Sequence, residues 1–363
     1  MIRVPYISHL AAALTRNKWG WVLSVTNLII TIAAFFAILV YVNWDLSHNR
    51  VWPDSHLIYR VASLDIPKSG PVSKNLLFPE SQVSVLSNFI GDQASDLTAV
   101  GAMQATATIN ERDVVVPLQF VNQNFLDFFQ LDTTQGDLDV ALSTPGYIAL
   151  EESMAKELFG SSSLAQINEP ITLMGSSSLS IVDGVPTMLP GREVAFTVGA
   201  IYKLPSPITS ATKFFALTLM HDFSQSLSAP ASGTPFSLVS IWMKIDSPKD
   251  ARQVENSLAG ITGVFAGFSG EAQLFLEPLR DIYFQNRGDI TTESPAGDIT
   301  RTTAIAIIGL MILVSGCSNT MSASMTDSLK QLRSIGVRRA FGGTRQHVFT
   351  LSFTTQIVLT AIA

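Results

Sequence analysis

The sequence predicts a membrane protein, with α-helical transmembrane segments and a large mixed α+β extracytoplasmic domain inserted between the first and second spans. The first observation is compositional: 14% of the 363 residues are charged and 47% are apolar, with a mean hydropathy of +0.31. Soluble domains are nearer a quarter charged. The second observation is a pair of long uncharged runs on either side of an acidic region, and the third is a basic segment beside each run.

The first uncharged run, residues 19–44, is predicted to be a transmembrane helix. Its sequence is WGWVLSVTNLIITIAAFFAILVYVNW, and about 20 apolar residues suffice to cross the hydrocarbon core. Trp19, Trp21, Tyr41 and Trp44 lie toward its ends, where aromatic rings favour the membrane interface. A cleaved signal peptide has a shorter apolar region of roughly 7–15 residues and a small-residue cleavage site. The length of this run and the VNWDLSHN that ends it favour an uncleaved span.

The second uncharged run, residues 302–326, is predicted to be the second transmembrane helix. Its first half, AIAIIGLMILV, is apolar, whereas its second half, SGCSNTMSASM, is small and polar and predicts close packing on another helix. VSGC resembles a lipoprotein acylation motif but lies inside the span, so Cys317 is interpreted as a small buried packing residue. Residues 348–363 are predicted to start a third transmembrane helix that is incomplete.

Charge placement predicts the orientation in the membrane. Residues 1–18 hold three basic and no acidic side chains, and residues 328–347 hold five basic and no acidic ones. Short basic flanks remain in the cytoplasm, so residues 1–18 and the loop 327–347 are predicted to be cytoplasmic. Residues 45–301, with 28 of the 29 acidic side chains, are predicted to be periplasmic or extracellular. The expected location is a bacterial inner membrane, with lipid as a partner, and the acidic balance argues against nucleic acid.

The region 45–301 has a mixed α/β pattern. Segments rich in β-branched and aromatic residues predict strands at 114–121, 146–150, 193–202 and 237–245. Segments that stop at glycine predict helices at 151–160 and 247–260.

No catalytic, cofactor-binding or metal-binding residue is predicted. The five histidines are scattered without an HExxH pair, and neither a P-loop nor a GxSxG motif occurs. The single cysteine excludes an internal disulfide. His48, Asp54 and His56 cluster loosely, and a solvated connector is favoured over a metal site because no third ligand spacing is recognisable. The chain is therefore not expected to be an enzyme.

The loop 327–347 has two open interpretations. Apolar residues recur at roughly helical spacing among basic ones, at Leu329, Leu332, Ile335, Val337, Ala340 and Phe341. Such a segment is either a positive flank that only sets topology or a short amphipathic helix that docks into a groove on a cytoplasmic partner.

Within this loop, LRSIGVRRAFGGT resembles the (R)xxEIGVRRAxGA[ST] segment of FtsX-like/MacB-like ABC transporter permeases. HLIYRVAS, FVNQNFLDFFQLDTTQGDLDVAL, ALEESMAKELFG, FTVGAIYKLP and PLRDIYF are similar, in the same order, to the family's periplasmic core domain. The resemblance implies an N-terminal span, a periplasmic domain and three further spans. It also implies that the loop after the second span is a coupling helix that rests on a separate or fused ATPase.

Carried over by position, the coupling residues are Ile335, Gly336, Val337, Arg338, Arg339, Ala340 and Gly342. Ser334 stands where the family has Glu, and Gly343 where it has Ala. The missing acid removes a charge-assisted contact of the kind worth about 1.5–3 kcal/mol.

The resemblance implies a permease subunit that transmits the ATP-driven motion of a cytoplasmic ABC ATPase to the periplasmic domain, for export, efflux or envelope substrate handling. A second permease half or a homodimer is the other implied partner. Because the family has a fourth span, the chain is expected to be truncated at its C-terminus. The alternative is a non-transporting membrane-anchored sensor or scaffold that regulates an envelope enzyme.

Overall fold

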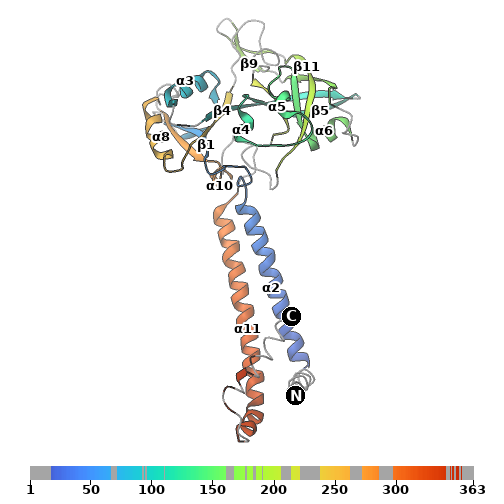
Figure 1. Ribbon diagram of the computed structural model, residues 1–363, viewed down its shortest axis with the longest axis vertical. Helices are drawn as coiled ribbons and strands as arrows, with labels where there is room; N and C mark the ends of the chain where they lie inside the picture. Colours follow the sequence, from blue (N-terminus) through green and yellow to red (C-terminus); the bar gives the residue numbers. More distant parts are fainter. Residues whose placement is uncertain are drawn as a thin grey trace. The chain divides into compact units, whose positions relative to one another are not determined.

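The computed structural model divides the chain into two compact units, a helical unit of Met1–Leu46 with Asp298–Ala363 and an α/β domain of Ser47–Gly297 (Figure 1). The structure describes residues 18–66, 72–91, 94, 96–109, 111–160, 167–175, 178–182, 185–189, 191–205, 214–220, 238–261, 272–285, 297–340, 344, 346, 349–350 and 353. Apart from Lys18, the predicted cytoplasmic segment 1–18 lies outside these residues.

The helical unit contains two long helices, α2 (Lys18–Leu46) and α11 (Ile299–Ala340). Each has a stretch of 25 residues, Val22–Leu46 and Ile299–Ala323, that is long and apolar enough to cross a membrane. α11 is 42 residues long and continues through most of the predicted loop 327–347. No proline interrupts α11, and each of its three glycines, Gly309, Gly316 and Gly336, lowers helix stability by only about 1 kcal/mol.

Small residues set the contact between α2 and α11. A Cβ atom at Gly309 would lie 2.8 Å from Cγ2 of Ile38, and one at Gly316 would overlap the side chain of Thr31. Close packing thus occurs at Gly309 in the apolar half of the second run and at Gly316 in its small-residue half, but most described residues of the small-residue half are exposed, so the predicted packing along that half is wrong. The interpretation of Cys317 as buried is wrong, because its side chain is exposed. The next residue along a helix is rotated by about 100° and faces elsewhere.

The α/β domain alternates strands with short helices. Its strands are β1 (Ile58–Asp65), β2 (Ser73–Asn75), β3 (Phe78–Pro79), β4 (Asp96–Ile109), β5 (Arg112–Val121), β6 (Asp132–Gly136), β7 (Tyr147–Glu151), β8 (Pro170–Gly175), β9 (Ser178–Val182), β10 (Val185–Leu189), β11 (Glu193–Lys203), β12 (Ala216–Leu219), β13 (Leu238–Lys244) and β14 (Ala272–Pro278). Its helices are α3 (Ser81–Ile90), α4 (Phe125–Phe128), α5 (Leu138–Ala141), α6 (Glu152–Phe159), α8 (Ala251–Leu258) and α10 (Ile282–Gln285), with a 3₁₀ turn at Ala259–Ile261. The predicted mixed α/β pattern is confirmed.

The main sheet runs in the order β14-β1-β13-β4-β5-β12-β7-β11-β6. β5 pairs with β12 and β7 pairs with β11 in parallel, and the other pairs along this path are antiparallel. β2 adds to β1, β3 adds to β13, β8 bridges β11 and β4, and β9 and β10 form a separate hairpin. The first strand of the domain, β1, therefore lies beside its last, β14, along most of the length of both.

Two clusters of buried side chains form the core. In the first, alternate residues of β5 point inward, so that Val114, Val116 and Leu118 are buried while Val115 is exposed. This is the period of two expected for a strand with one buried face.

The second cluster is aromatic. Phe129 lies 5.2 Å from Trp52, 5.3 Å from Phe214 and 5.4 Å from Trp242, measured between ring centroids in edge-to-face arrangements. Such pairs add about 0.5–1.5 kcal/mol beyond the area that they bury. Through Trp52, this cluster fixes the segment that follows α2 to the core of the domain.

Candidate functional site

The predicted coupling residues lie in the last two turns of α11. Helical backbone is found at Ile335, Gly336, Val337, Arg338, Arg339 and Ala340, and Gly342 lies outside the described residues. Val337 is 53% exposed and Leu329, two turns earlier, is 64% exposed. The coupling segment therefore offers apolar side chains on a continuous helix. The side chains of Ile335, Arg338 and Arg339 are outside the described set.

The loose cluster of His48, Asp54 and His56 is only partly a solvated connector. Asp54 and His56 are exposed, but His48 is buried and stacks on the ring of Tyr283, with centroids 3.9 Å apart and planes 4° apart. The interpretation of His48 as solvated is wrong, because the segment that follows α2 folds onto the end of the domain. Among the residues that the structure describes, no three His, Cys, Asp or Glu side chains are placed to hold a metal ion.

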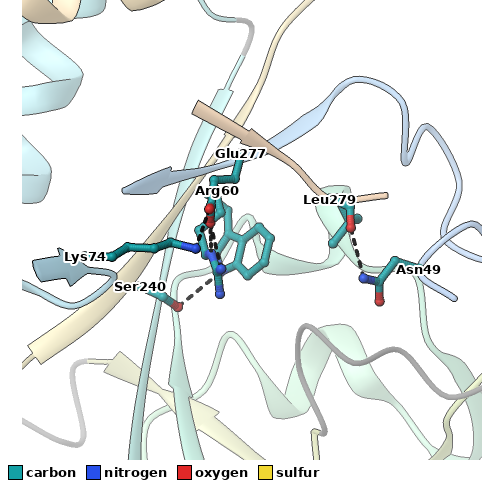
Figure 2. Close-up of polar contacts among 7 residues, drawn as sticks. Asn49, Arg60, Lys74, Ser240, Glu277 and Leu279 are labelled. Carbon is teal, nitrogen blue, oxygen red and sulfur yellow. Dashed lines mark hydrogen bonds and ion pairs between the residues drawn. The ribbon is translucent and has the colours of Figure 1, made fainter. Parts of the chain in front are cut away.

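Two connectors join the α/β domain to the rest of the chain, and they are bonded to each other. The N-terminal connector is residues 47–57, after α2, and the C-terminal connector is residues 279–285 with Gly297, before α11. Nδ2 of Asn49 donates a hydrogen bond of 2.9 Å to the carbonyl of Leu279 (Figure 2). The amide of Leu279 in turn donates to the carbonyl of Ile58 at 2.9 Å.

Asn49 adopts a conformation that few residues tolerate. Its φ is +60° and its side chain is fully buried. Asparagine visits this left-handed region more readily than most side chains because its short polar group bonds locally. One N–H of the Asn49 side-chain amide donates to the Leu279 carbonyl. The left-handed backbone at Asn49 therefore orients this side chain toward the C-terminal connector.

Tyr283 closes the C-terminal connector. The amide of Gly297 donates to the carbonyl of Tyr283 at 2.7 Å. A Cβ atom at position 297 would overlap the Tyr283 ring, so only glycine fits there without a shift. The Tyr283 ring therefore contacts both His48 and Gly297.

One layer further into the domain, a buried charge cluster joins β1 to β14. Arg60 and Glu277 are direct neighbours across the two strands. Nη2 and Nε of Arg60 lie 2.7 Å and 3.1 Å from Oε2 of Glu277, and Nζ of Lys74 lies 2.5 Å from Oε1 (Figure 2). The Arg60 and Glu277 side chains are only 2% and 3% exposed.

An aromatic ring completes this environment. Cζ of Arg60 lies 6.0 Å from the centroid of the Trp242 ring, within cation–π range. Nε1 of Trp242 donates to Oγ of Ser240 at 3.1 Å, and Ser240 donates to the carbonyl of Val100 at the same distance. The two carboxylate oxygens of Glu277 are therefore paired with Arg60 and Lys74, and the Trp242 ring covers the Arg60 guanidinium.

These contacts form what we call the connector clasp, defined as His48, Asn49, Arg60, Glu277, Leu279 and Tyr283. The clasp pairs buried groups with one another, so its chemistry is to hold two strands in register. Breaking a buried ion pair leaves an uncompensated charge. Sequence reasoning missed the clasp, although two charged residues inside apolar runs, Arg60 in LIYRVAS and Glu277 in LFLEPL, were a usable signal.

The fold and the clasp define a class of protein: an α/β domain whose first and last strands are neighbours, preceded by an apolar helix of membrane-spanning length. The chain belongs to the MacB-like periplasmic core domain family, which matches residues 21–261. The resemblance to the MacB-like periplasmic core domain is therefore confirmed, and the matched residues end before the coupling motif.

The solved structures that are similar to the chain include the following three. A domain of a candidate permease protein from Porphyromonas gingivalis has a TM-score of 0.44 and 15% identity, covering 62% of this chain and 91% of that one. The extracellular domain of the noncanonic ABC-type transporter YknZ from Gram-positive bacteria has a TM-score of 0.41 and 15% identity, covering 60% of this chain and 99% of that one. The periplasmic region of MacB from Actinobacillus actinomycetemcomitans has a TM-score of 0.39 and 13% identity, covering 63% of this chain and 92% of that one. No curated protein matches the chain.

Proposed function

We propose that the chain is the permease subunit of a MacB-like ABC transporter. In this role it transmits the ATP-driven motion of a partner ATPase, through a coupling helix and membrane spans, to a periplasmic α/β domain that handles an exported or envelope substrate. Family membership supports the role. The observation that carries it is the continuity of α11, in which one unbroken helix joins a stretch of membrane-spanning character, Ile299–Ala323, to the coupling residues.

Exposure along the helices supports the membrane placement. Large apolar side chains of α2 and α11 point outward, among them Leu23, Ile30, Val40 and Met311. Such a surface is unfavourable in water and suits lipid. The basic segments 1–18 and 328–347 then lie in the cytoplasm and the acidic α/β domain outside it, which makes the chain a multi-pass protein.

The far end of α11 supports the coupling role. Met325, Leu329 and Val337 are exposed and lie four and eight residues apart, so they share one face of the helix. An apolar face on a basic helix fits a groove in a partner. ATP binding and hydrolysis are then carried out by that partner, since the sequence has no P-loop. The chain itself has no catalytic role, and a second permease half or a second copy completes the transporter.

The proposal is tested first by isolating the tagged chain from its native membrane and identifying what co-purifies. A P-loop ATPase is expected. The ATPase rate of that partner is then measured in lipid nanodiscs with and without the chain. Charge reversal at the coupling motif, Arg338→Glu with Arg339→Glu, should abolish the stimulation.

A matched control carries the same change of charge one to two turns earlier on the same helix, Lys330→Glu with Arg333→Glu, and should retain most of the stimulation. Equal stimulation by the wild type and the Arg338/Arg339 variant would contradict the proposal. Recovery of an envelope enzyme in place of an ATPase would favour the sensor or scaffold role.

A further inference from the structure

We draw no further inference here: the strongest candidate, the open groove between α2 and α11 that is lined by the polar side chains of Asn27, Thr31, Ser315 and Asn319, carries none because nothing in the structure shows what covers it.

Discussion

The α/β domain and the helical unit bury opposite kinds of side chain. In the α/β domain, valines, leucines and aromatic rings are inside, and the buried charges Arg60 and Glu277 are paired. In the helical unit, the large apolar side chains point outward, and Leu23 is 68% exposed. Among the described side chains of this unit, the buried ones are polar, namely Thr31, Asp45 and Thr302.

This difference in burial is the one expected if the α/β domain lies in water and the helical unit lies in lipid, as proposed above. Water drives apolar groups inward in the α/β domain. Lipid offers no such drive between helices, and small residues and hydrogen bonds hold them together instead. The contact between α2 and α11 uses both, with Gly316 against Thr31 and the Thr302 hydroxyl donating to the buried carboxylate of Asp45. The comparison therefore supports the membrane placement proposed for the helices.

The largest expected effect is on the buried ion pair of the α/β domain. Glu277→Gln removes the carboxylate that pairs with both Arg60 and Lys74 and should lower the free energy of unfolding by about 3–5 kcal/mol. Denaturant unfolding of the full chain in detergent, followed by tryptophan fluorescence, measures this. The paired replacement of Arg60→Met with Glu277→Leu removes both charges and should recover most of the loss. A Glu277→Gln variant as stable as the wild type would show that the cluster is not buried as described.

The corresponding change in the helical unit should be smaller. Thr302→Val keeps the shape of the side chain and removes the hydroxyl that donates to Asp45. Loss of one partner of a buried polar group costs about 1–3 kcal/mol. Cysteine cross-linking between α2 and α11 in membranes should become less efficient, whereas Thr303→Val, at an exposed position, should leave it unchanged. Equal cross-linking in both variants would contradict the role of the buried contact.

Alkaline pH tests the aqueous core alone. Burial, with a smaller contribution from the charge of Glu151, raises the pKa of Tyr202 well above its ordinary value. The Tyr202 hydroxyl donates a hydrogen bond of 2.9 Å to the Phe214 carbonyl. A raised pKa gives stability that is complete below the unfolded pKa of about 10 and is lost as the pH rises toward the folded value. Tyr202→Phe should cost about 1 kcal/mol at neutral pH. It should also flatten the alkaline decline in unfolding free energy measured between about pH 8 and pH 11. An unchanged slope would contradict the assignment.

The smallest expected effect is at the surface of the α/β domain. A hydrogen bond of 3.0 Å from Lys244, together with its charge, lowers the pKa of the half-exposed Asp54. A lowered pKa gives stability that is present above the unfolded pKa and is lost as the pH falls through the folded one. Asp54→Asn, which tolerates the same left-handed backbone, should cost less than about 1 kcal/mol at neutral pH. The difference from the wild type should shrink in acid and in high salt, and a constant difference would assign it to another cause.

Local patterns predicted four of the 14 strands and two of the six α-helices that the structure describes in the α/β domain. The predicted strands 114–121, 146–150, 193–202 and 237–245 correspond to β5, β7, β11 and β13, because β-branched and aromatic runs are strong local signals. β6 was not predicted, since its sequence DTTQG has no apolar pattern and its pairing with β11 holds it in the sheet.

The clasp was beyond local reasoning for a different reason. Its partners Arg60 and Glu277 are 217 residues apart, and no spacing rule connects the first and last strands of a domain. The coupling residues could be predicted from local sequence because they form one short contiguous motif, and their role stays a prediction. His48 was misread because its burial depends on Tyr283, far along the chain.

The pairing of β1 with β14 has a consequence for how such a chain is assembled. Both ends of the segment Ser47–Gly297 emerge from the same edge of one sheet. A domain with adjacent ends behaves as a cassette, because it can be spliced into a host at a single point or closed into a ring and reopened elsewhere. Exchange of the whole cassette between members of the family would replace the α/β domain and leave the helices that receive it unaltered.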